Sequence, residues 1–137
     1  MIECVHAAYV GYVADIGRRP APMDADYVDL IDRGVVYVLR EASNDRLYAV
    51  IVLYAEDGDL FIENVAVDPE RQHHGYGRQL MAFAEALALK LGLPEIRLYT
   101  HERMTRNIAF YTALGFEEVE RREEHGFARV FMHKRLG

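Results

Sequence analysis

The change of hydrophobic period between residues 60 and 100 constrains the fold more than any other feature. Leu60–Val67 is rich in β-branched and apolar residues, which predicts a strand. Residues 75–91 instead carry apolar side chains at helical spacing, and Gly92 ends that helix. Ile96–Thr100 then returns to a strand pattern. Strand, helix and strand in this order form a βαβ unit, so we expect two parallel strands joined by a right-handed crossover.

The segments on either side of this unit predict an α+β domain. Val35–Glu41, Leu47–Tyr54 and Leu60–Val67 are joined by short turns and predict an antiparallel meander. The C-terminal part predicts a helix and then two strands that turn at His125-Gly126, over about Thr105–Leu114, Glu117–Arg122 and Ala128–Lys134. The whole order therefore favours a mixed, mostly antiparallel sheet.

The N-terminal segment predicts two helices. Ile2, Val5, Tyr9, Val13 and Ile16 recur at three- and four-residue spacing, which indicates one helix that ends at Gly17. Asp24 is a candidate cap for a second, short helix, with Tyr27, Leu30 and Ile31 facing inward. The sequence given therefore opens in a helix, with no strand ahead of it.

Composition excludes several classes of protein. The 137 residues carry a net charge of −6, opposite in sign to that of a general nucleic-acid binder. A single cysteine excludes an intramolecular disulfide framework. No apolar run reaches the roughly 20 residues that cross a bilayer, and Met1-Ile2-Glu3-Cys4 does not resemble a secretory signal. We expect one cytoplasmic domain over residues 1–137 that binds neither nucleic acid nor membrane.

A glycine pair lies where the chain enters the long helix. Gln72-His73-His74-Gly75-Tyr76-Gly77-Arg78 joins a strand to that helix. The first N–H groups of a helix have no partner within it, and glycines let a phosphate approach them closely. The alternative is an ordinary glycine-containing turn, because a short glycine motif alone is weak evidence. No third glycine supports a Rossmann motif, and no Gly-Lys-Ser/Thr supports a P-loop.

Two motifs here resemble those of the GNAT superfamily of acyl-CoA-dependent N-acyltransferases. Gln72-x-x-Gly75-x-Gly77, after Asn64–Pro69, resembles motif A at the start of the helix that follows the fourth strand. Asn107–Phe116, with its Asn, its Tyr and then Leu-Gly-Phe, resembles motif B. The resemblance runs from about Val35 to the C-terminus. It implies a GNAT-like sheet of about six strands flanked by helices, with a splayed parallel pair in its centre.

The resemblance implies that acetyl-CoA is the cosubstrate. Backbone groups of Val65 and Val67 would pair with the pantetheine arm. The backbone N–H groups that would hold the pyrophosphate belong to Gln72, His73, His74, Gly75, Gly77 and Arg78. The Arg78 side chain would contact phosphate or simply face solvent. We expect no metal, because the adjacent rings of His73 and His74 rarely orient on one ion and no carboxylate or Cys cluster accompanies them.

The resemblance also implies a catalytic acid. Tyr111 matches the tyrosine whose phenol lies near the CoA sulfur and donates a proton to the leaving thiolate. The alternative is a half-buried aromatic residue. Asn107 lies four residues earlier on the same helix face and is expected to bind CoA. The usual motif B asparagine lies seven residues before the tyrosine, where this chain has Met104, so Met104 is expected to serve in packing.

The general base is open between two positions. Phe61, Glu63, Val65 and Val67 alternate along one strand and are expected to share one face, so Glu63 is the first candidate. A cross-strand ion pair is the alternative for Glu63. His101, just past the next strand, is the second candidate, because imidazole titrates near neutrality.

Transfer is expected to be direct rather than through a covalent acyl-enzyme. Cys4, the chain's single cysteine, belongs to no catalytic motif, so it is expected to be a structural thiol. The main hypothesis is acetyl transfer to a primary amine in a ternary complex. Two alternatives remain: a non-catalytic acyl-CoA-binding regulatory module, and a purely structural domain.

The acceptor is open among small metabolites, antibiotic-like amines, peptide N-termini and protein lysines. Residues expected to border it, from their position in the fold, are Tyr9, Tyr12, Met23, Tyr27 and Phe127. GNAT domains usually begin with a strand, and here that strand is absent from the sequence given. We therefore expect Val35–Glu41 to lie at a sheet edge that a homodimer contact or an N-terminal segment covers; the alternative is a natural chain that starts upstream of Met1 and includes the strand.

Overall fold

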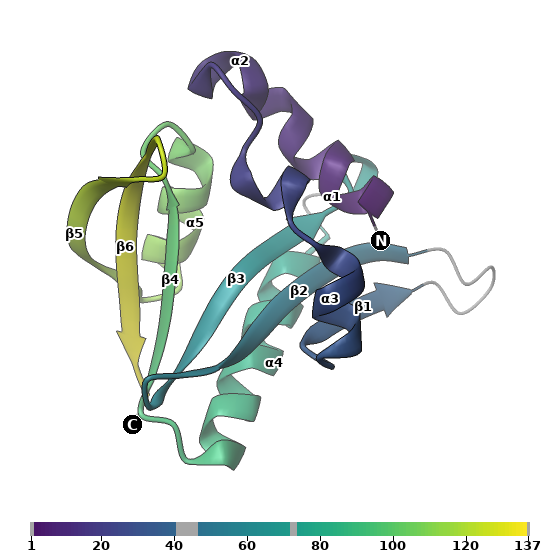
Figure 1. Cartoon of the computed structure of the whole chain (residues 1–137). Helices are drawn as coiled ribbons and strands as arrows, with labels where there is room; N and C mark the ends of the chain where they lie inside the picture. Colours follow the sequence, from purple (N-terminus) through teal and green to yellow (C-terminus); the bar gives the residue numbers. More distant parts are fainter. Residues whose placement is uncertain (1, 41–46, 72–73, 137) are drawn as a thin grey trace.

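The computed structural model describes residues 2–40, 47–71 and 74–136, and its centre is a six-stranded sheet (Figure 1). The strand order is β1-β2-β3-β4-β6-β5, with only β3 and β4 parallel. The strands are β1 (Val36–Arg40), β2 (Leu47–Glu56), β3 (Asp59–Val67), β4 (Glu95–His101), β5 (Glu117–Glu124) and β6 (Phe127–Arg135). The predicted mixed, mostly antiparallel sheet is confirmed. Strand β1 lies at one edge, as expected, whereas Glu41 lies outside the described residues.

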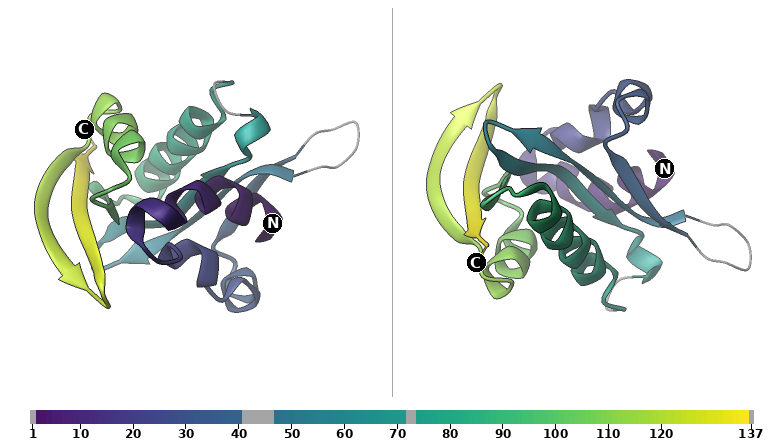
Figure 2. Two further views of the ribbon diagram at one scale, coloured as in Figure 1. Left: turned by 90° about the horizontal axis from the view of Figure 1, so that it is seen from above. Right: turned by 90° about the horizontal axis from the view of Figure 1, so that it is seen from below.

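Helices cover both faces of the sheet (Figure 2). They are α1 (Ile2–Tyr9), α2 (Val13–Ile16), α3 (Tyr27–Asp32), α4 (Tyr76–Leu91) and α5 (Thr105–Ala113). A 3₁₀ turn over Val10–Tyr12 separates α1 from α2, so the single helix predicted from Ile2 to Ile16 is interrupted. No helix in the described ranges is long and apolar enough to span a membrane.

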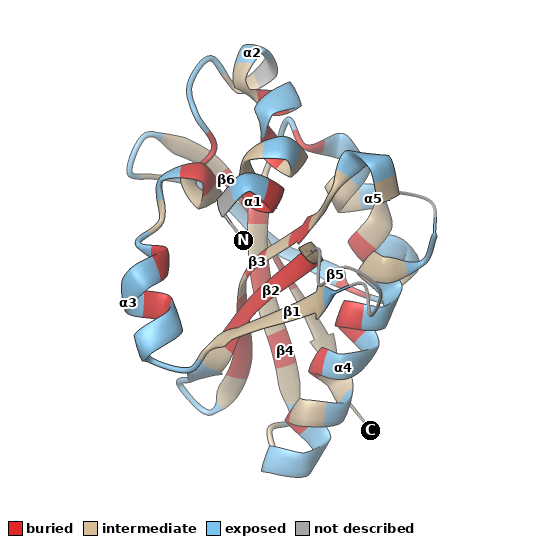
Figure 3. Ribbon diagram, turned by 90° about the vertical axis from the view of Figure 1, so that its right-hand side faces the viewer, coloured by how far each residue is buried: buried red, intermediate tan, exposed pale blue. Residues whose placement is uncertain are grey.

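Alternation along β2 builds two cores from one strand. Ala49, Ile51 and Leu53 pack with α4 and α5 on one face, whereas Val50 and Val52 pack with α1 and α3 on the other. The middle of β2 is therefore buried on both sides (Figure 3). Burying one such side chain contributes about 1.5–3 kcal/mol, so β2 anchors the sheet on which the site is built.

Two predictions about α3 are wrong. Asp26 caps the helix by accepting a hydrogen bond from the Asp29 N–H at 3.1 Å, whereas Asp24 ends a preceding 3₁₀ turn and pairs with Arg19 at 2.9 Å. Ile31 is 54% exposed, because this short helix meets the sheet through Tyr27 and Leu30 alone.

Strands β3 and β4 diverge halfway along their length (Figure 1). They pair only from Leu60–Ile62 to Ile96–Leu98, although both strands continue beyond this point. The splayed parallel pair that the family resemblance implies is therefore present. It opens the sheet immediately after Ile62.

A β-bulge in β3 lies at the same point. Leu53 pairs with Ile62 and Val52 pairs with Asn64, which leaves Glu63 as an extra residue in β3. A bulge of this kind reverses the alternation of the side chains that follow it. Val65 and Val67 accordingly pack on the α4 side, and Ala66 packs on the α1 side.

The bulge makes one sequence prediction wrong. Strict alternation placed Glu63 on the face of Val65 and Val67, but Glu63 accepts a hydrogen bond from the Tyr54 hydroxyl at 3.1 Å. Tyr54 pairs with Phe61 across the ladder and contacts its ring at 5.7 Å between centroids. Glu63 therefore lies with Phe61 on the face opposite Val65 and Val67.

Candidate active site

Two hollows meet where β3 and β4 diverge. The first, here called the cavity, holds about 540 Å³ of empty space, part of it open to solvent, and lies between α1, the Pro20–Pro22 segment, β3, β4, β6 and α5. The second, called the groove, holds about 1150 Å³ of empty space, also partly open to solvent, and runs between α1, β3 and the N-terminal ends of α4 and α5. Both hollows are lined by Tyr9, Val65, Asn107 and Tyr111. These four residues mark the place where a ligand in one hollow would touch a ligand in the other.

The groove contains an anion site at the start of α4. Gly75 caps this helix with φ of +81°, a conformation that favours glycine. The first helical hydrogen bond runs from the Gln79 N–H to the Gly75 carbonyl at 3.0 Å, so the N–H groups of residues 76–78 have no partner within the helix. These N–H groups, which lie outside the helical hydrogen-bond ladder, and the helix dipole favour a phosphate here.

Close packing also favours glycine at position 77. A Cβ atom there would lie 3.2 Å from Cζ of Phe110 in α5. Three arginines, Arg71, Arg78 and Arg106, line the same groove in a chain of net negative charge. His74 is exposed and its ring stacks on Tyr76, whereas Gln72 and His73 lie outside the described residues. The groove can therefore bind a polyanion.

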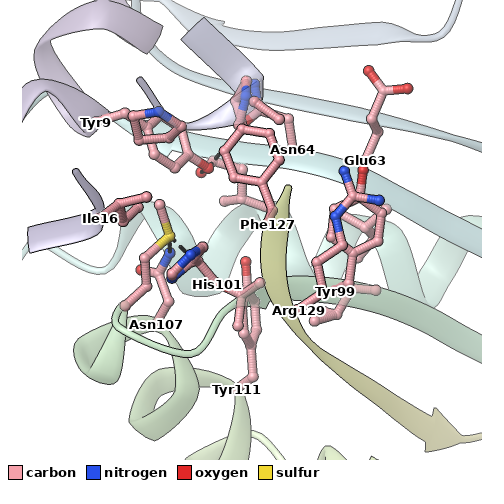
Figure 4. A pocket seen from close by; sticks show the side chains of 18 residues that line it. Tyr9, Ile16, Glu63, Asn64, Tyr99, His101, Asn107, Tyr111, Phe127 and Arg129 are labelled. Carbon is pink, nitrogen blue, oxygen red and sulfur yellow. Dashed lines mark hydrogen bonds between the residues drawn. The ribbon is translucent and has the colours of Figure 1, made fainter. Parts of the chain in front are cut away.

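Tyr111 lies at the junction of the cavity and the groove. Helix α5 holds it between Phe110 and Phe116, and it is only 6% exposed. Its hydroxyl points into the cavity (Figure 4) and makes no hydrogen bond to the described residues. Burial, with a smaller contribution from Tyr12, holds the pKa of Tyr111 well above its usual range. The phenol is therefore a protonated donor at any physiological pH.

Asn107 lies one turn before Tyr111, and Met104 is the N-cap residue of α5, seven residues before Tyr111. Met104 is buried, and the Thr100 hydroxyl donates to its sulfur at 3.4 Å. The Asn107 amide donates to the same sulfur at 3.5 Å and lines both hollows. Met104 thus serves in packing, as expected, and it fixes the orientation of Asn107.

A buried chain of hydrogen bonds forms one wall of the cavity. The Tyr9 hydroxyl donates toward Asn64 Oδ1 at 2.7 Å and toward the Val65 carbonyl at 2.8 Å. The Asn64 amide donates to the Tyr27 hydroxyl at 2.9 Å, which in turn donates to the Pro22 carbonyl at 2.5 Å. Burial raises the pKa of both tyrosines, so they stay neutral. This network ties α1 and α3 to the bulged part of β3.

The predicted acceptor residues fall in different places. Tyr9 and Phe127 line the cavity, whereas Tyr12 lines the groove. Met23 and Tyr27 are buried among the residues of the α1–α3 core and line neither hollow.

The two candidate bases also line the cavity. The Glu63 carboxylate extends to the side away from Tyr111 (Figure 4), where Tyr54 donates to it. Burial lowers the pKa of His101, and the Arg103 N–H donates to its Nδ1 at 3.1 Å. The neutral His101 ring therefore carries its proton on Nε2 and has no nitrogen lone pair left for a substrate proton. Of the two, the Glu63 carboxylate is the one that keeps lone pairs for a substrate proton, although it extends away from Tyr111.

Arg129 and Tyr99 belong to the cavity, and the sequence reasoning missed both. Arg129 is 9% exposed, and its guanidinium lies 4.1 Å from the Tyr99 ring centroid. Arg129 stands beside His101 in the β4–β6 ladder, a register that spacing along the chain does not reveal. The available signal was a lone arginine within the otherwise apolar run Phe127–Met132.

Cys4 is a structural thiol in this arrangement. It is buried in α1, and its Sγ lies 4.0 Å from the Ala66 carbonyl oxygen. Burial raises the pKa of Cys4 to about 11, so the thiolate form is negligible at neutral pH. Cys4 lines neither hollow.

The fold and this pair of hollows define an acetyltransferase of the GNAT class. Residues 7–116 match the model of the acetyltransferase (GNAT) family, and the chain belongs to that family. The resemblance found in the two sequence motifs is therefore confirmed. A search of curated proteins gave no match.

Solved structures show the same fold. PaiA N-acetyltransferase from Thermoplasma acidophilum, in complex with coenzyme A, is 20% identical with a TM-score of 0.79, over 98% of this chain and 90% of that one. An acetyltransferase from Bacillus cereus ATCC 14579 is 27% identical with a TM-score of 0.65, over 74% and 72% of the two chains. The ribosomal-protein-S18-alanine N-acetyltransferase from Escherichia coli is 24% identical with a TM-score of 0.64, over 73% and 67%.

Proposed function

We propose that the protein transfers an acetyl group from acetyl-CoA to a primary amine by direct attack in a ternary complex. The observation that carries this proposal is the position of Tyr111, whose protonated hydroxyl lies where the groove meets the cavity. The groove takes the cosubstrate, with its pyrophosphate at the N-terminus of α4 and its thioester toward Tyr111. The cavity takes the amine. Membership of the GNAT family and the coenzyme A bound in the related PaiA structure support this arrangement.

The reaction needs two proton movements. An alkylammonium with a pKa of about 10.4 must lose a proton before its nitrogen can attack the thioester carbon. Glu63 accepts that proton through water in the cavity. The C–N bond forms, the C–S bond breaks, and Tyr111 donates its proton to the departing thiolate. With Cys4 buried and protonated, no covalent acyl-enzyme is part of this scheme.

Release of free thiol from acetyl-CoA across a panel of primary amines tests the function. We expect amine-dependent thiol release at least tenfold above hydrolysis, because a positioned acid alone contributes about 100-fold or more. Calorimetric titration with acetyl-CoA is run on the same sample. Tight binding without thiol release from any amine would favour a non-catalytic acyl-CoA-binding module. No binding at millimolar acetyl-CoA would contradict both readings.

Exchanging Glu63 for glutamine tests the base. The side-chain carbonyl of the new glutamine would still accept the hydrogen bond from Tyr54, so the cavity keeps its shape while it loses the carboxylate. We expect kcat/KM for the amine to fall about 100-fold and the pH–rate profile to lose one ionisation. Glu56→Gln is the matched control, because Glu56 is an exposed carboxylate at the end of β2 that lines neither hollow. An unaltered pH–rate profile in Glu63→Gln would remove Glu63 from the mechanism.

A further inference from the structure

Arg129 is a nearly buried charge that the proposed reaction does not use. Arginine is almost never buried without a partner, because desolvating a guanidinium is costly. Its Nη1 donates to Glu124 at 2.8 Å, and its guanidinium lies 4.1 Å from the ring centroid of Tyr99 and 5.9 Å from that of Phe127. These contacts fix the side chain against the cavity wall, so little side-chain entropy remains to be lost when it binds a ligand.

Part of the guanidinium stays available to a ligand. Within the described part of the chain, Nε and Nη2 of Arg129 make no hydrogen bond, and neither atom is sealed from solvent. Arg129 lines the cavity, so these donors can meet whatever occupies it. In Figure 4 the guanidinium lies between Tyr99 and Phe127 on the side of the cavity where Glu63 also projects.

Glu124, the partner of Arg129, belongs to a larger ion-pair network outside the cavity. Glu124 Oε2 also lies 2.9 Å from Arg122 Nη2, and Arg122 pairs in turn with Glu120 at 2.9 Å, so two guanidinium groups share two carboxylates. Neither of these carboxylates lines the cavity. Glu63 forms no ion pair with Arg129 among the described residues, since its partner is the Tyr54 hydroxyl. Arg129 and Glu63 therefore line the cavity as a cationic and an anionic side chain that do not pair with each other.

We propose that the amine acceptor also carries a carboxylate, which Arg129 binds inside the cavity. This inference rests on the proposed acetyl transfer and adds the chemical class of the acceptor: a small amino acid or a closely related amine. The planar guanidinium suits a planar carboxylate, and its single charge matches a monoanion rather than a phosphate dianion. The cavity adjoins the groove at Tyr9, Val65, Asn107 and Tyr111, so a small acceptor held by Arg129 would lie next to the thioester.

The experiment compares each of a set of α-, β- and γ-amino acids with its own carboxamide in the thiol-release assay. For the wild type we expect kcat/KM at least tenfold higher for the acid of the preferred pair. A carboxamide lowers the pKa of its own amine and so supplies more free amine at a given pH. A preference for the acid therefore cannot come from amine ionisation. Diamines of similar length are included as acceptors without a carboxylate.

Arg129→Gln removes the charge and should bring the acid-to-amide ratio close to one, through a higher KM for the acid with little change for the amide. Arg129→Lys should restore part of the preference. Arg122→Gln is the matched control: Arg122 shares Glu124 but lies outside the cavity, so the wild-type ratio should persist.

Calorimetry on the wild type gives the same comparison without a variant. With CoA present, we expect an N-acetylamino acid to bind more tightly than its amide.

Equal use of acid and amide by the wild type, a preference for diamines, or an unchanged ratio in Arg129→Gln would each overturn the carboxylate site. These results would leave acetyl transfer itself intact, because thiol release would still depend on amine. Absence of thiol release with every amine overturns the proposed function, and the acceptor class with it.

Discussion

Exchanging Tyr111 for phenylalanine is expected to lower kcat for acetyl transfer about 100-fold or more, with little change in the affinity for acetyl-CoA. The phenol is the protonated group at the junction of the two hollows, and its ring alone supplies the packing against Phe110 and Phe116. The variant therefore keeps the ring and loses the proton donor. Stopped assays of thiol release give kcat, and calorimetry gives the dissociation constant of acetyl-CoA.

The pH dependence of the wild type follows from the raised pKa of Tyr111. Burial keeps the phenol protonated above its ordinary range, so the acid form is not lost as the pH rises toward about 10. The rate should therefore climb with amine deprotonation and show no fall from tyrosine ionisation below that pH.

Tyr37→Phe is the matched control for Tyr111→Phe, because Tyr37 lies on β1 and lines neither hollow. Equal rates for Tyr111→Phe and the wild type would rule out the acid role.

Exchanging Gly77 for aspartate is expected to weaken acetyl-CoA binding about 100-fold. The new carboxylate would lie among the N–H groups at the start of α4 and repel the pyrophosphate at the site that favours an anion. Its Cβ atom would also approach Phe110, so part of the loss is steric. Calorimetry at several salt concentrations measures both the affinity and its electrostatic part.

Gly77→Asn separates the two causes. Asparagine has nearly the size of aspartate and no charge. We therefore expect the asparagine variant to bind acetyl-CoA roughly tenfold more tightly than the aspartate variant, a difference of about 1.4 kcal/mol. A carboxylate in the first turn favours the helix by about 0.3–1 kcal/mol, so the aspartate variant should melt no lower than the asparagine variant. Equal affinities in the two variants would mean that no anion binds at this end of α4.

Local patterns were sufficient to predict the framework of the sheet and the groove. The meander, the parallel crossover and the glycines before α4 depend on residues near one another in the sequence, where period and turn chemistry apply directly. The bulge at Glu63 was not predictable in this way. It arises where β3 stops pairing with β4 but continues to pair with β2. The pairing of two strands is not visible in the residue pattern of one strand.

The acceptor side of the site depends on contacts between distant segments. Arg129 reaches the cavity because β6 pairs with β4, and Tyr27 is withdrawn from it because Asn64 and Pro22 engage its hydroxyl. Tertiary packing decided both of these outcomes. The wrong cap of α3 has a local cause instead, because Asp24 ends a 3₁₀ turn and Asp26 therefore caps the helix.

The cavity and the groove share only four of their lining residues, so most substitutions in the lining of one hollow leave the lining of the other unchanged. The groove is lined by α1, β3, α4 and α5, whereas the Pro20–Pro22 segment and β6 line the cavity alone. Substitutions in that segment or in β6 can therefore alter the shape and charge of the cavity without moving Gly75, Gly77 or Tyr111. Under the proposed function, acceptor range and cosubstrate use can therefore vary separately, and Tyr9, Val65, Asn107 and Tyr111 form the boundary that both hollows share.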